Sequence, residues 1–397
     1  MVSIKQDFNL RDFEDSLSEI ADQDPNLRLP NKIKAEVLGG VAALAQLIVT
    51  WSRATGADGE LQVYARELDE KAFSNFAHTV TGLVALNMAH KIRSAYGDKV
   101  FERGAALERS RPFVEAMHAK SLSNLREYSK TTIPLLCIDN ARALRLPGRL
   151  YKDPENVRER AEFEDLLRAC YDVVGPDHHV RIGGKLMESA ARLVYEAFVN
   201  THQHAQTNVR RDKLERSVRG VLVGYRSVLS DRLVDAAENH RPLQDYFRAW
   251  RPVDPRMRTA QFMDISIFDS GAGLAQTWLA GKNQLTQGIR EEQVSLEREL
   301  QAVYDCLKKG GTTKPGDTSG NGLFRIMEVV RRAGGFVRIR SGRLSLVKAF
   351  AYAAPPLDPD HITMEDAMDG GAPHKARSWA EGTTISVLLP LNRGADL

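Results

Sequence analysis

The spacing of apolar residues in the first part of the chain alternates between a helical and a strand-like pattern. Apolar positions recur every three or four residues in several segments, which predicts amphipathic helices. These segments are 8–22, 31–56, 69–95 and 154–174. The second helix is expected to begin at Asn31, a favourable N-cap residue, and to end at Gly56. Short apolar segments at 61–65 and 133–138 predict strands, the later one buried, so this part is expected to be helix-rich α/β.

The second part of the chain has longer strand-like segments between its helices. We expect a helix over 186–206, a strand that ends at Asp269, a charged helix over 291–309 and a last strand over 383–391. A strand hairpin is expected between 336 and 352, with Gly342 at its turn.

Length and a break in the pattern together predict two domains. A chain of 397 residues exceeds the usual size of a single core. The helical pattern of 154–174 stops at Gly175 and Pro176. We therefore place the boundary after residue 178, with an N-terminal domain over 1–178 and a second domain over 179–397.

The helix expected over 186–206 has three polar residues at intervals of four, Glu196, Asn200 and His204. This spacing brings the three side chains to one face of the helix. A carboxylate, a carboxamide and an imidazole in a row can supply a base, an oxygen ligand for a hard cation and a donor to an anion. Such a set suits a magnesium nucleotide. A polar face open to solvent is the alternative explanation for these three residues taken alone.

Asp269 stands where a strand meets a glycine-containing turn. The alternating sequence before it predicts a strand, and Gly271 and Gly273 then release the chain into a turn that a ligand can approach closely. A carboxylate at such a strand end can accept a hydrogen bond from an exocyclic amine. The alternatives are a turn capped by the aspartate and, more weakly, a calcium loop.

A glycine-rich segment lies between the helices expected around 300 and 325. Its glycines, which include Gly320 and Gly322, surround Lys314 and lead into a helix after Asn321. Backbone N–H groups, one lysine and a helix N-terminus suit a triphosphate. The segment is not a Walker loop, because no strand feeds a GK[ST] sequence. A flexible surface linker remains the alternative.

In this order, these segments and the sequence GTTIS at 382–386 resemble the GHKL ATPases, the family of gyrase, heat-shock chaperones, histidine kinases and MutL. The resemblance covers residues 180 to 393 and leaves the first part of the chain unassigned. It implies a two-layer α/β sandwich, in which a mixed sheet backs a layer of helices. It also implies that ATP and Mg²⁺ bind between the helices and a mobile lid.

The resemblance implies a role for each residue of these segments. Glu196 would be the general base and Asn200 the magnesium ligand, and Asp269 would bind adenine. The other expected nucleotide contacts are His204, Lys314, Gly271, Gly273, Gly320, Asn321, Gly322 and Thr384. The sequence at Gly320, Asn321 and Gly322, which would contact the phosphates, departs from the pattern of many kinases. Those kinases have more glycine in this segment.

The function implied is slow, magnesium-dependent ATP hydrolysis that drives a conformational switch. Lid closure would change a surface seen by a protein partner or by a second copy of the chain. Two alternatives share the same pocket: a protein kinase that phosphorylates a partner, and a nucleotide-sensing scaffold without turnover. No phosphoacceptor histidine motif is evident, which disfavours autophosphorylation on histidine.

Composition narrows the choice of partners and of compartment. Lysine and arginine number 55 against 52 for aspartate and glutamate, so net charge does not indicate nucleic acid. A local cluster of arginines at 210–219 is more simply a solvated face. The apolar run at 37–51 is too short to span a bilayer. The three cysteines form no CxxC pair, and the N-terminus lacks a secretory pattern, so we expect a cytoplasmic protein without a zinc site.

Overall fold

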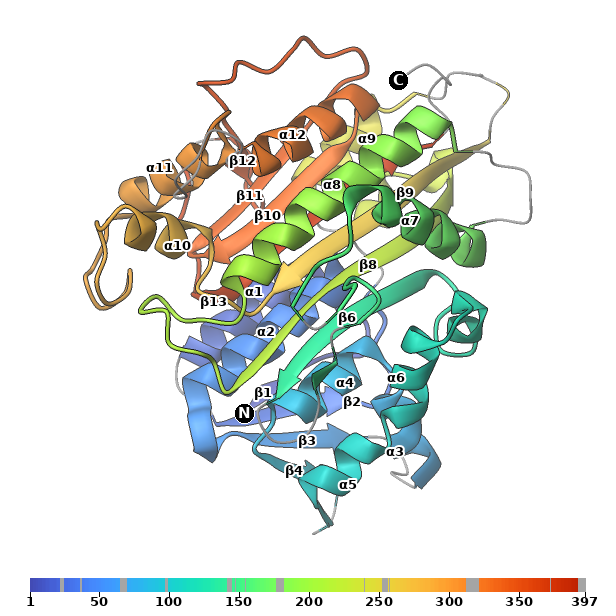
Figure 1. Cartoon of the computed structure of the whole chain (residues 1–397), viewed down its shortest axis with the longest axis vertical. Helices are drawn as coiled ribbons and strands as arrows, with labels where there is room; N and C mark the ends of the chain where they lie inside the picture. Colours follow the sequence, from blue (N-terminus) through green and yellow to red (C-terminus); the bar gives the residue numbers. More distant parts are fainter. Residues whose placement is uncertain are drawn as a thin grey trace.

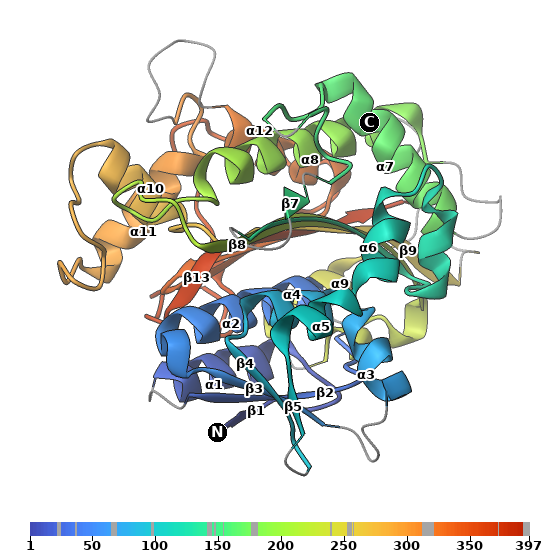
Figure 2. The ribbon, with the colours of Figure 1, turned by 60° about the horizontal axis from the view of Figure 1, so that its bottom comes forward.

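The computed structural model contains two β-sheets and two layers of helices. It describes residues 1–21, 25–35, 38–64, 70–96, 99–140, 145–146, 148–153, 155–175, 182–238, 240–251, 256, 258–311, 321–371 and 373–391. Figure 2 shows the layers in order: the smaller sheet, helices α1, α2 and α4, the larger sheet, and helices α7, α8 and α12. The expected mixed α/β class is thereby confirmed.

The smaller sheet is built from the start of the chain and is mostly parallel. Its strands are β1 (Val2–Ser3), β2 (Asn26–Pro30), β3 (Glu60–Tyr64), β4 (Lys91–Ser94) and β5 (Val100–Phe101), in that spatial order. Only the β4–β5 pair is antiparallel. The connecting helices are α1 (Leu10–Ala21), α2 (Gly40–Thr55), α3 (Glu70–Ala77) and α4 (Val80–Met88). Because crossovers between neighbouring parallel strands have one hand, helices that join strands in sequential order lie on the same face.

The larger sheet is antiparallel throughout and draws strands from both parts of the chain. Its order is β12-β11-β10-β13-β9-β8-β6-β7. The strands are β6 (Thr132–Asn140), β7 (Arg145–Leu146), β8 (Arg216–Leu229), β9 (Thr259–Asp269), β10 (Phe336–Gly342), β11 (Leu344–Ala349), β12 (Glu365–Asp366) and β13 (Ala380–Pro390). Its central strands are buried on both faces, as expected for a sheet between two helical layers.

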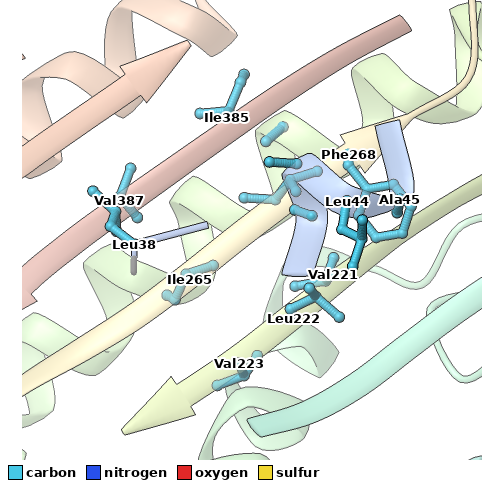
Figure 3. Close-up of a cluster of buried hydrophobic side chains, with 14 of the residues drawn as sticks. Leu38, Leu44, Ala45, Val221, Leu222, Val223, Ile265, Phe268, Ile385 and Val387 are labelled. Carbon is cyan, nitrogen blue, oxygen red and sulfur yellow. The ribbon is translucent and has the colours of Figure 1, made fainter. Parts of the chain in front are cut away.

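Helices cover both faces of this sheet. On one face lie α7 (Arg160–Val174), α8 (Gly184–His204) and α12 (Gly322–Ala333), with α10 (Leu274–Gly281) and α11 (Leu296–Leu307) beside one end (Figure 1). On the other face lies α2, whose Leu44 and Ala45 belong to the same buried cluster as Phe268 and Leu222 (Figure 3). The elements outside these layers are α5 (Arg103–Glu108), α6 (Arg111–His118) and α9 (Arg241–Ala249).

Polar side chains join the first helices to the larger sheet. Arg340 of β10 donates two hydrogen bonds to the buried Glu14 of α1, at 3.0 and 3.1 Å. Gln46 of α2 is 1% exposed and donates from Nε2 to the carbonyl oxygens of Arg340 and Glu381, each at 3.1 Å. Buried polar groups of this kind require their partners, so the two sheets are held in one fixed relation.

Most expected elements are confirmed, and the largest differences concern two helices expected in the first part of the chain. The helix expected to begin at Asn31 begins at Gly40, because Gly39 adopts a left-handed conformation with φ of 71°. The segment expected to be helical over 69–95 is two helices and a strand. Thr79 starts the second of these helices, since its Oγ1 accepts a hydrogen bond from the N–H of Gly82 at 2.9 Å.

The expected boundary after residue 178 falls inside one structural unit. Strand β6, on the N-terminal side, pairs with β8 along its whole length, from Thr132 with Gly224 to Asn140 with Arg216. Helix α7 also packs against α8 across this position. A buried strand needs partners for its backbone groups, and β8 supplies them. Residues from 132 onward therefore contribute to the larger sheet.

Candidate functional site

Helix α8 places its three polar residues along the wall of a cavity. Glu196, Asn200 and His204 all line this space, which has a volume of about 410 Å³. The opposite face of the helix carries buried apolar residues, including Met187, Ala191 and Phe198, that pack into the core. Core packing thus fixes the rotation of the helix, and the expected shared face is confirmed.

The floor of this cavity comes from alternate residues of two neighbouring strands. Ile267 and Asp269 of β9 and Thr383 and Ile385 of β13 line it. Successive side chains of a strand point to opposite faces, so Thr384 points the other way. Its Oγ1 donates to Oε1 of Gln46 in α2 at 3.1 Å, and it is fully buried there. Thr384 therefore lies on the wrong face of the sheet for the expected nucleotide contact, and Thr383 lines the cavity instead.

Asp269 ends strand β9 inside the cavity. Its side chain is 9% exposed, and its Oδ1 accepts a hydrogen bond from the N–H of Gly271 at 2.7 Å. Burial raises the pKa of this carboxyl to about 6, although the backbone hydrogen bonds from Gly271 and Thr383 act in the opposite direction. The group combines a turn-capping bond with an oxygen available at the cavity wall.

The two glycines after Asp269 serve different contacts. A Cβ at Gly271 would lie 2.3 Å from the carbonyl oxygen of His204, so this glycine allows the end of α8 to approach the turn. It does not line the cavity. Gly273 does line it, has φ of 87° and precedes α10. A side chain at Gly273 would also meet Ser341, whose Oγ lies 2.8 Å from the position of a Cβ.

The N-terminus of α12 opens at the cavity next to α8. Asn321 and Gly322 line the space, and the N-cap Asn321 makes no side-chain capping bond to the helix. Instead, its Oδ1 accepts a hydrogen bond from the N–H of Gly310 at 3.0 Å. A Cβ at Gly322 would lie 3.3 Å from Oε2 of Glu196 and 3.4 Å from Nδ2 of Asn200. First-turn N–H groups and the helix dipole favour an anion at this end.

Glu196 forms an ion pair across the cavity wall. Nη1 of Arg325 donates to its Oε1 at 2.5 Å, and the two side chains are 38% and 17% exposed respectively. Arg325 belongs to α12, one turn after Gly322. The carboxylate expected to act as a base is thus bound to a cation in this structure.

Asn200 is, with Gln203, one of two carboxamide residues of α8 that line the cavity. No hydrogen bond joins its side chain to another described residue. Its oxygen is a ligand of the type that Mg²⁺ accepts beside phosphate oxygens and water, so the residue fits such an ion. Among the residues that the structure describes, no group of three or more histidine, cysteine, aspartate or glutamate side chains could hold a metal by itself.

Several expected residues lie outside the described ranges. Lys314 and Gly320 fall in 312–320. The expected lid contacts of Lys314 and Gly320 therefore stay predictions.

Sequence reasoning missed several residues of this cavity. Arg325, Thr383, Thr277 and Trp278 all line it. Arg325 follows Gly322 by three residues, a spacing that places both on one helical face, so this arginine could have been found. Trp278 gives no comparable signal, because an apolar residue in a short helix is usually part of a core.

The arginine cluster at 210–219 is partly internal. Arg219 is 2% exposed, forms an ion pair with Asp139 and donates from Nε to the hydroxyl of Tyr151 at 2.8 Å. Arg216 donates to the carbonyl oxygen of Met88 at 2.8 Å. These two side chains bind the protein itself, which weakens the case for a surface that contacts nucleic acid.

Comparison of the chain with protein-family models, curated protein sequences and solved structures gives no match in any of the three. Within the described ranges, none of the helices combines the length and the apolar character that a membrane span requires.

Proposed function

We propose that the chain is a magnesium-dependent ATP-binding protein with slow ATP hydrolysis, built on a sandwich of the GHKL type. One observation carries this proposal: Glu196 and Asn200 of α8, Asp269 of β9 and the open N-terminus of α12 line a single cavity. Its volume of about 410 Å³ lies in the range of small-molecule sites. These parts come from three separate segments of the chain, and each supplies a group that a magnesium nucleotide requires.

The adenine end is assigned to Asp269. Its carboxylate oxygen can accept a hydrogen bond from the exocyclic amine, and the neighbouring Thr383 adds a hydroxyl on the same face of the sheet. Ile267 and Ile385 supply apolar surface for the base. Gly273 permits the backbone to pass beside it.

The phosphate end is assigned to the junction of α8 and α12. The first-turn N–H groups of α12 donate to phosphate oxygens, and Arg325 supplies a cation beside them. Asn200 would hold Mg²⁺, which when bound offsets the charge of the phosphates and polarises them toward attack. Glu196 would accept the proton of the attacking water.

The ion pair between Glu196 and Arg325 favours a second candidate. A carboxylate oxygen that is bonded to a guanidinium is not free to contact an attacking water, so a protein that keeps this pair with nucleotide bound would sense ATP without turnover. In the hydrolytic alternative, phosphate oxygens compete for Arg325 and release the carboxylate.

Incubation with ATP labelled on its γ-phosphate separates these candidates. Released inorganic phosphate supports the ATPase. A stable label on added or co-purified protein supports a kinase, and binding with neither outcome supports the sensor. Absence of ATP binding, measured by calorimetry with Mg²⁺ present, would overturn the proposal as a whole.

The conformational part of the proposal follows from the resemblance. Closure over bound nucleotide would present a changed surface to a protein partner or to a second copy of the chain. Light scattering with and without magnesium ATP tests self-association directly.

A further inference from the structure

A second and larger cavity lies on the opposite face of the same sheet. It has a volume of about 750 Å³ and lies between the larger sheet and the first helices of the chain. Asp264 and Ser266 of β9 line it, whereas Ile267 and Asp269 of the same strand line the cavity described above. Alternate side chains of β9 therefore point into different cavities, and the second cavity has its own set of polar groups.

Helix α2 begins at this cavity. Gly39, Gly40 and Val41 line the space, and within the described ranges no side chain caps the first turn of this 16-residue helix. Gly39 is pressed onto the sheet, since a Cβ there would lie 2.1 Å from Oγ of Ser386. The helix therefore presents the positive end of its dipole at the cavity wall.

A hydroxyl that makes no hydrogen bond to a described residue lies at the same cavity. Thr81, in the first turn of α4, is 7% exposed and lines the space. Within the described part of the chain, no residue exchanges a hydrogen bond with its hydroxyl. Most of this residue is enclosed, so its hydroxyl is a donor and acceptor open to a ligand or ordered water in the cavity. The neighbouring Thr79 is different, because it already caps the helix.

Arg226 adds further donors. Its Nε donates to Oδ2 of Asp264 at 2.5 Å, which offsets the charge of that buried carboxylate. No other described residue accepts a hydrogen bond from the guanidinium, so the Nη groups keep their donors for a ligand. The remaining acidic side chains of the wall, Asp235 and Glu238, are exposed.

Aromatic residues form another part of the wall. Phe113 and Tyr128 line the cavity with their ring centroids 5.2 Å apart, and Tyr225 lines it from β8. Apolar walls with a few converging polar groups are typical of sites for small organic molecules.

We propose that this second cavity binds a small organic anion, with its carboxylate or phosphate group at the α2 N-terminus, Thr81 and Arg226, and its aromatic body against Phe113, Tyr128 and Tyr225. The site does not depend on ATP binding in the first cavity. Both carboxylate and phosphate groups offer the acceptor oxygens that these donors need.

Phenyl phosphate and benzoate serve as probes, with the full-length protein and calorimetry or ligand-observed NMR. Thr81→Val keeps the shape of the side chain and removes the hydroxyl, and we expect it to weaken binding of the better probe about tenfold. Arg226→Lys keeps a cation beside Asp264 and should weaken binding as well. The matched control is Thr277→Val, on the wall of the first cavity, which should leave probe binding unchanged.

A non-hydrolysable ATP analogue at saturation distinguishes the two cavities. If the probe binds equally well with the analogue present and binding falls in Thr81→Val, the proposal holds. Three results would overturn it: no binding of either probe, equal binding to Thr81→Val and the parent protein, or displacement of the probe by the analogue. A protein that fails to bind ATP can still pass this test, so the two proposals fail separately.

Discussion

Arg325 of α12 holds Glu196 of α8 by a 2.5 Å contact between Nη1 and Oε1. The pair joins the two helices at the point where the phosphates of a nucleotide would lie. Whether Glu196 acts as a base therefore depends on its release from this arginine, and the first experiment concerns this carboxylate.

Glu196→Gln should reduce phosphate release by about 10² to 10⁴-fold and leave ATP binding in place, because the amide keeps the size of the side chain and loses proton acceptance. Steady-state phosphate release and calorimetry measure the two effects. The matched control is Glu188→Gln, two turns earlier on α8, where an exposed carboxylate lies 3.6 Å from Arg160. Undiminished release in Glu196→Gln would exclude this residue as the base.

The same variant tests the conformational switch. If turnover resets a closed state, Glu196→Gln should accumulate in that state and form more dimer with magnesium ATP than the parent protein does. Light scattering reports the mass. Slower release without a change in mass would keep the base and discard the dimer.

Asp269→Asn should lower the affinity for ATP by about tenfold to a hundredfold, since a charge-assisted contact contributes about 1.5 to 3 kcal/mol. Calorimetry at neutral pH measures this loss. The amide oxygen can still accept the hydrogen bond from Gly271, so circular dichroism should show an unchanged fold. Equal affinity in variant and parent would make Asp269 a turn cap only.

Binding of adenosine should strengthen as pH rises from 5 to 7. Burial raises the pKa of Asp269 to about 6, and only the ionised form accepts a hydrogen bond at both oxygens. Adenosine is preferred to ATP because it has no phosphate that titrates in this range. Asp269→Asn should give a flat profile, and a flat profile in the parent protein would contradict the assignment.

The raised pKa of Asp269 also predicts a change in stability. Between its unfolded pKa of about 3.9 and its folded pKa of about 6, the folded protein binds more protons, so the free energy of unfolding falls as pH rises through this window. The contribution lost by pH 7 is about 3 kcal/mol. In urea unfolding, the free energy of unfolding of Asp269→Asn should therefore rise relative to that of the parent protein from pH 4 to pH 7. A constant difference would contradict it.

Asn200→Ala should remove the dependence of ATP binding on Mg²⁺. The carboxamide oxygen is the ligand assigned to the ion, and alanine supplies none. Calorimetric titrations with Mg²⁺ and with EDTA give the comparison for variant and parent. A variant that still needs Mg²⁺ to the same degree would place the ion elsewhere.

Glu14→Gln should destabilise the whole protein by about 3 to 5 kcal/mol, because it leaves buried Arg340 and Arg338 without their counter-charge. The midpoint of urea unfolding measures the loss. Asp15→Asn, at an exposed position of the same helix, is the matched control and should have little effect. Equal midpoints for both variants would show that the buried pair contributes nothing net.

The sequence predicted the local geometry of this site well and the contacts between distant segments poorly. Spacing by four placed Glu196, Asn200 and His204 on one face, since helical geometry alone determines that relation. Thr384 was assigned to the wrong side because a strand's inward face depends on its partners, and Gln46 is 338 residues away. The pairing of β6 with β8 could not be predicted for the same reason. A buried apolar run indicates that a strand exists, and it does not indicate which strand pairs with it.

Strand β9 forms a wall of both cavities, with its odd-numbered residues on one side and its even-numbered residues on the other. Insertion or loss of one residue near its middle would reverse the faces to which the side chains of one half of the strand point. A side chain that lines one chamber would then point into the other. Point substitutions can alter either chamber by itself. A change in the length of this strand that preserves both chambers must therefore lie at one of its ends.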